Sequence, residues 1–101
     1  MSDKYILSGK VPVQADLMTW AKWFETADRH VDNTAIGRYR VSTVFLGLDH
    51  QFGEGPPLIF ETMVFADGGS DDLWCERCST WEQAEAMHQR GCDYVRSLQV
   101  N

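Results

Sequence analysis

The chain has 101 residues and carries 15 acidic and nine basic side chains, which gives a formal net charge of −6 at pH 7. This length fits one domain with a modest core, so we expect a single domain over residues 1–101. Hydrophobic residues make up 44% of the chain and aromatic residues 12%, which excludes a disordered protein. No uninterrupted apolar run is long enough for a membrane-spanning helix, so we expect no membrane contact.

The net charge and the number of cysteines limit the classes of partner and the cellular compartment that are expected. An excess of negative charge opposes attraction to phosphate backbones, so we expect no direct binding of nucleic acid. The first residues contain no basic segment followed by an apolar core, so a secretion signal is not expected and the cytoplasm is the predicted compartment. Three cysteines are an odd number, which favours free thiols over a disulfide framework.

The first third of the chain predicts a hairpin and then a helix. Apolar residues flank Ser8-Gly9-Lys10 on both sides, which indicates a short edge hairpin or a strand with a turn. Asp16 has the side chain of an N-cap, and apolar residues recur at helical spacing from Leu17 to about Val31. We expect this helix to turn its apolar stripe to a sheet. The polar segment 32–37 breaks the periodicity.

Two strands are expected in the middle of the chain. Residues 41–46 and 58–65 are rich in β-branched and aromatic side chains, which is typical of strands. The three adjacent apolar residues Val44, Phe45 and Leu46 predict at least partial cover on both faces of the first strand. Between the strands, segment 49–57 contains two prolines and two glycines, so it is expected to be an exposed loop.

The last third predicts a third strand and a long helix. A Gly/Asp-rich turn over residues 66–72 precedes the candidate strand 73–78. Ser79 and Glu82 have the spacing of a capping box, with Thr80 and Gln83 as an offset alternative. Apolar residues then recur at helical spacing to the end of the chain.

These elements, in the order β(β)αβββα, predict an α+β domain. We expect a small antiparallel sheet of three to five strands with two helices packed on one face. Apolar side chains on the opposite face would then need a partner subunit, which makes a homodimer an expectation.

Four segments carry a resemblance to a known family. They are WAKWFETADRH (20–30), VSTVFLGLDH (41–50), GPPLIFETMVF (55–65) and STWEQAEAMH (79–88). Together they resemble a family of small uncharacterised proteins of bacteriophages, prophages and bacteria, and the likeness spans most of the chain. The resemblance implies no activity or functional residues. It implies a phage accessory protein that binds host machinery in the host cytoplasm.

One candidate small-molecule site lies around the central strands. Asp49 and His50 end the first strand, and Glu61 interrupts the apolar sequence of the second. A carboxylate in an apolar strand faces solvent, pairs with a cation or lines a pocket. Arg38 and Arg40 are the expected cationic partners. This set predicts either a small enzyme or ligand-binding protein with a sheet-face pocket, or a structural ion pair at Glu61.

A second candidate is a zinc site. Cys75 and Cys78 have a two-residue gap, and His88 and Cys92 have helical i, i+4 spacing, which fits tetrahedral zinc ligation. Residues three apart on a continuous strand point to opposite faces, so the first pair can chelate only if the strand ends between them. Three buried thiols without metal are the preferred interpretation, and no cofactor is expected.

The sequence contains no nucleophile with matched spacing and no phosphate-binding glycine loop, so we expect a binding protein rather than an enzyme. A protein partner is expected to contact either the uncovered sheet face or an acidic surface. The carboxylates expected on that surface are Glu25, Asp28, Asp71 and Asp72. Together with the resemblance, this predicts an inhibitor of a host system, such as an antiviral defence.

Overall fold

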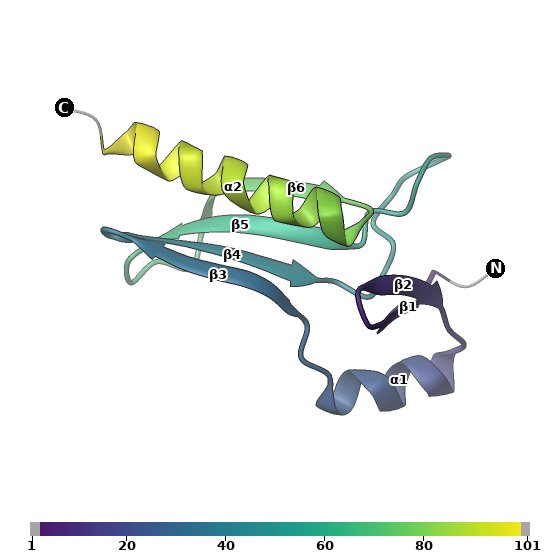
Figure 1. The fold of residues 1–101 in the computed structure, drawn as a ribbon. Helices are drawn as coiled ribbons and strands as arrows, with labels where there is room; N and C mark the ends of the chain where they lie inside the picture. The colour runs from purple at the N-terminus through teal and green to yellow at the C-terminus, as the bar shows by residue number, and fades with distance from the viewer. Residues whose placement is uncertain (1–2, 100–101) are drawn as a thin grey trace.

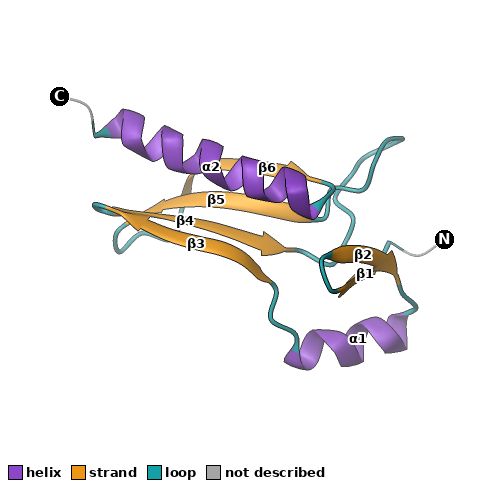
Figure 2. Cartoon of the chain, viewed as in Figure 1, coloured by secondary structure: helices purple, strands orange, loops and turns teal. Residues whose placement is uncertain are grey.

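The computed structural model describes residues 3–99 as two antiparallel sheets and two helices (Figures 1 and 2). In chain order the elements are β1 (Tyr5–Ser8), β2 (Val11–Gln14), α1 (Leu17–Thr26), β3 (His30–Ile36), β4 (Tyr39–Phe45), β5 (Phe60–Ala66), β6 (Asp72–Cys78) and α2 (Trp81–Leu98). One sheet is the hairpin β1-β2, and the other has the strand order β3-β4-β5-β6. The predicted α+β class with antiparallel pairing is confirmed.

The main core lies between α2 and one face of the four-stranded sheet (Figure 1). Alternate residues of β4 and β5 point to this face, as the two-residue period of a strand requires, and they are fully buried. They are Val41, Thr43, Phe45, Phe60, Thr62 and Val64. At Gly91, in the middle of α2, an added Cβ would lie 3.0 Å from Cγ1 of Val41. Glycine therefore allows the helix to approach the sheet closely.

The first helix is shorter than expected. Asp16 caps it as predicted, because its carboxylate accepts the N–H of Thr19 at 2.9 Å. The helix ends at Thr26 instead of near residue 31, since Ala27 adopts extended backbone angles. Residues 30–36, which include most of the expected break, form the edge strand β3.

The place of α1 also differs from the expectation. It packs against β1 rather than along the four-stranded sheet, and Figure 1 shows it beyond the end of that sheet. The Trp23 ring reaches the main core, with its centroid 5.7 Å from that of Phe45. Of the two helices described within residues 3–99, α2 is therefore the one that packs along the four-stranded sheet.

The capping box of α2 forms at the offset position. Oγ1 of Thr80 accepts the N–H of Gln83 at 3.1 Å. The amide oxygen of Gln83 accepts the N–H groups of Thr80 and Ser79 at 3.2 and 3.0 Å. The preferred pairing of Ser79 with Glu82 is therefore wrong, and its predicted alternative is confirmed.

The face of the four-stranded sheet away from α2 carries the remaining strand side chains. Val44, Met63 and Phe65 point to this face by alternation and are half-buried, and Leu73 is exposed. We call this surface the open face. Within residues 3–99, no helix combines the length and the hydropathy that crossing a membrane requires.

Candidate functional site

Glu61 lies on the open face, and its cationic partner is Arg77. Nε of Arg77 donates to Oε2 of Glu61 at 2.8 Å, and the Cys75 thiol lies 3.7 Å from the same oxygen. Arg38 and Arg40 do not take the role expected for them, because the strand register places Arg77 opposite Glu61 and pairs Arg40 with Phe65. The ion pair with Arg77 explains how a carboxylate can be only 8% exposed in this strand.

Asp49 has a structural task at the base of the loop between β4 and β5. Its Oδ1 accepts the N–H groups of Gln51 and Leu58 at 2.8 and 3.0 Å, while the N–H of His50 donates to the carbonyl of Leu58 at 3.1 Å. The imidazole of His50 is exposed. Within residues 3–99, no hydrogen bond or ion pair joins Glu61 to Asp49 or His50. The structure therefore does not assemble the predicted pocket.

The loop that Asp49 closes presents Phe52 to solvent. The Phe52 side chain is 96% exposed, which is extreme for a large aromatic residue. The sequence analysis did not single out this residue. The signal was available, because a phenylalanine between Gln51 and Gly53 in a loop expected to be exposed has no core to enter.

Other apolar side chains are exposed at the same end of the molecule. Figure 1 shows the hairpin, the start of α1 and this loop at the end away from the C-terminus, with the loop and α1 on opposite sides of the hairpin. We use the name apolar end for the exposed large hydrophobic side chains at this end of the molecule, which are Val11, Val13, Leu17, Met18 and Phe52.

Backbone contacts at Gly47 hold these segments together. The carbonyl of Gly47 accepts the N–H of Tyr5 at 2.9 Å and the indole N–H of Trp20 at 3.0 Å. Two residues further, the N–H of Asp49 donates to the carbonyl of Asp3 at 2.9 Å. The loop thus starts from a point bonded to both β1 and α1.

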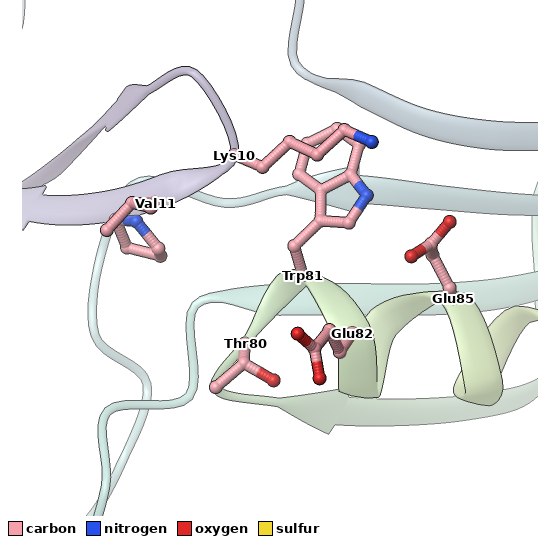
Figure 3. Close-up of a pocket in the computed structure, with 7 residues that line it drawn as sticks. Lys10, Val11, Thr80, Trp81, Glu82 and Glu85 are labelled. Atoms are coloured by element: carbon pink, nitrogen blue, oxygen red, sulfur yellow. The ribbon is translucent and has the colours of Figure 1, made fainter.

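A groove of about 520 Å³ separates the hairpin from the start of α2 (Figure 3). The Lys10 side chain extends across the indole of Trp81, with Nζ 5.6 Å from the ring centroid. This distance permits a cation–π contact between the hairpin and α2. Val11 lines both this groove and the apolar end.

The four predicted partner-binding carboxylates do not form one patch. Glu25 is exposed on α1, and Asp28 precedes β3, where it accepts the N–H of His30 and pairs with its ring. The hydrogen bond from that N–H lowers the pKa of Asp28. Asp71 and Asp72 lie at the opposite end of the four-stranded sheet, at the turn into β6.

The structure does not bring the four predicted zinc ligands together. Cys75 and Cys78 belong to the continuous strand β6, where Cys75 lies on the open face and Cys78 packs on the α2 side. Cys92 is buried beside apolar residues, and His88 is bound by hydroxyl groups. Among residues 3–99, no group of three or more His, Cys, Asp or Glu side chains could hold a metal ion. All three cysteines are free thiols, but the expectation that all three are buried is wrong, because Cys75 is exposed and Cys78 is half-buried.

His88 belongs to a buried polar network that the sequence analysis did not predict. Its Nε2 lies 2.8 Å from Oγ1 of Thr34 and its Nδ1 lies 2.7 Å from Oγ1 of Thr43, which bonds in turn to Thr62. The Asp32 carboxylate lies 3.6 Å from Nε2. Burial lowers the pKa of His88, and the charge of Asp32 opposes this effect. Because Thr43 and Thr62 are fully buried, the network stabilises the core and is not open to a substrate.

Comparisons of the chain with protein-family models, with curated proteins and with solved structures found no match.

Proposed function

We propose that this chain is a non-enzymatic binding protein that docks on a macromolecular partner through its apolar end. The observation that carries the proposal is the 96% exposure of Phe52 on a loop closed by Asp49. Aromatic side chains that enter a pocket of a partner often dominate the binding energy of an interface. Full burial of such a side chain contributes about 1.5–3 kcal/mol.

The local structure also supports binding through this loop. Hydrogen bonds from Gln51 and Leu58 to Asp49 fix the base of the loop before a partner arrives. A segment ordered in advance loses less conformational entropy on binding. The open face is a weaker candidate, because Val44, Met63 and Phe65 are already half-buried there and the Glu61–Arg77 ion pair lies beside them.

The resemblance to phage and prophage proteins supports a host protein as the partner. We propose an inhibitor of a host system, such as an antiviral defence, as the specific role. The net charge of −6 favours a partner whose binding site has a basic rim, because complementary charge speeds association.

Comparative capture tests this function. The tagged protein, its Phe52→Ala variant and its Leu98→Ala variant are incubated with lysate of the natural host, and the bound proteins are quantified by mass spectrometry. Leu98 is the matched control, because it is also exposed but lies at the other end, in the last turn of α2. We expect one protein to be captured by the parent and the Leu98 variant and lost with Phe52→Ala. Equal capture by all three would contradict the proposal.

A further inference from the structure

At the end of the four-stranded sheet opposite the apolar end, two turns border a cavity of about 360 Å³. The β3–β4 turn contributes Gly37 and Arg38, and the β5–β6 turn contributes Asp67, Gly68 and Gly69. The N–H of Asp67 donates to the carbonyl of Arg38 at 2.6 Å, so a backbone hydrogen bond fixes one turn against the other. The glycines add no side chains to the space between them.

Two guanidinium groups belong to this cavity. Arg38 and Arg40 both line it and both are exposed. Arg38 is the second residue of the β3–β4 turn and Arg40 lies two positions further on in β4, and the cavity brings both side chains to one site. The Arg40 guanidinium lies 4.8 Å from the ring centroid of Phe65, its cross-strand neighbour. A guanidinium stacked on an aromatic ring is partly ordered before it meets a ligand.

Arg38 and Arg40 differ from the other arginines because no hydrogen bond from either guanidinium to a protein acceptor is found within residues 3–99. Within residues 3–99, neither guanidinium lies within ion-pair distance of a carboxylate, although the protein is strongly acidic. The other four arginines all donate to acceptors, which are the carbonyl of Phe45 for Arg29, Glu61 for Arg77, Glu76 for Arg90 and Asp93 for Arg96. Among residues 3–99, the one carboxylate that lines the cavity is that of Asp67.

We propose that this cavity binds a phosphate dianion between Arg38 and Arg40. Two neighbouring positive charges that repel each other are stabilised by one shared anion. Each planar guanidinium can donate two parallel hydrogen bonds, and a phosphate group has enough oxygens for both. The two guanidiniums outweigh the single charge of Asp67, so the cavity has a net positive charge in an otherwise acidic protein.

The test is an amide NMR titration with sodium phosphate at pH 7.5, with sodium chloride added to hold the ionic strength constant. Adenosine monophosphate serves as a second probe. Equal affinity for both probes identifies the phosphate group alone as the ligand, and tighter binding of the nucleotide identifies a phosphate ester. In either case we expect saturable shifts at the amides of residues 37–40 and 66–69.

Matched variants decide whether the two arginines carry the binding. Arg38→Gln and Arg40→Gln should each weaken phosphate binding by about fivefold or more, because a charged, bidentate donor is lost. Arg96→Gln changes the net charge by the same amount and should leave the affinity within about twofold, since charge at a distance is screened. Phe52→Ala should bind phosphate as the parent does, so this proposal can fail independently of the proposed function. Absence of saturable shifts, or equal effects of all three arginine variants, would overturn the proposal.

Discussion

The environment of Cys75 makes an exposed thiol unreactive. Partial burial of its sulfur and, next, the charge of Glu61 raise the pKa of Cys75 to about 11, while Arg77 acts in the opposite direction. The thiolate is the reactive form. At pH 8 a thiol with this pKa is roughly 0.1% thiolate, against about 9% for a pKa of 9.0. The exposure of Cys75 therefore does not make it a reactive site.

Glu61→Gln should speed the alkylation of Cys75 by iodoacetamide at pH 8 by about threefold to tenfold. The substitution removes the neighbouring negative charge and leaves Arg77 without its partner, and both changes lower the pKa of the thiol. Site-specific mass spectrometry of the folded protein measures the rate. Glu76→Gln is the matched control, because Glu76 pairs with Arg90 instead. An unchanged rate in Glu61→Gln would contradict this account.

His88 should make the stability of the fold depend on pH. Its pKa is lowered in the folded protein, mainly by burial, so between the folded pKa and the ordinary value of 6.5 the unfolded chain binds more protons. The contribution of neutral His88 to the free energy of unfolding is therefore fully present above about pH 6.5. On acidification below that pH the free energy of unfolding falls by at most about 1.4 kcal/mol per pH unit.

Urea unfolding at pH 7.5 and pH 5.5 measures this loss. The loss should disappear in His88→Gln, which cannot titrate, and persist in His50→Gln, which changes an exposed histidine. The carboxylates with lowered pKa, such as Asp16 and Asp28, lose their contribution only at lower pH. An equal loss in wild type and His88→Gln would show that other groups cause the pH dependence.

At the scale of elements, substitutions at Thr80 and Ser79 test which of the two residues caps α2. Thr80→Ala removes the hydroxyl that accepts the N–H of Gln83 and should lower the free energy of unfolding by about 1 kcal/mol. Ser79→Ala should change it by less than about 0.5 kcal/mol, because only the backbone of Ser79 takes part in the cap. Denaturant unfolding compares the two variants. A larger loss in Ser79→Ala would place the cap one residue earlier.

The sequence predicted the elements that have a strong local signal. The hairpin around Gly9, the two central strands and the long final helix each combine a regular pattern with a clear start or stop residue. β3 lacked this signal, because Asp32 and Asn33 are unfavourable in strands and a register shift near residue 32 disturbs its alternation. The end of α1 was missed because Ala27 favours a helix and tertiary contacts decide its conformation.

The candidate sites were harder to predict for the same reason. Contacts such as that of Glu61 with Arg77 depend on which strands become neighbours. The sequence did not predict the position of β6 beside β5 in the sheet. In the His88 network, Thr34 and Thr43 lie 54 and 45 positions before His88 in the chain. Polar residues on four separate elements give no common sequence pattern. Phe52 alone had a local signal.

At the scale of the molecule, the two ends of the four-stranded sheet differ in chemistry. Apolar side chains gather near the hairpin, α1 and the β4–β5 loop, whereas Arg38 and Arg40 lie at the opposite turns. The molecule is elongated, with extents of 50 × 30 × 23 Å, so ligands at the two ends need not compete. The homodimer expected from the open face stays a prediction.

The affinity of the captured partner for Phe52→Ala tests the central claim most directly. Calorimetric titration gives the dissociation constant for the parent, Phe52→Ala and Leu98→Ala, and thermal unfolding checks that all three are folded. We predict that Phe52→Ala weakens binding by at least about tenfold, which corresponds to about 1.4 kcal/mol, and that Leu98→Ala stays within about twofold of the parent. A folded Phe52→Ala variant that binds as tightly as the parent would contradict docking through the apolar end.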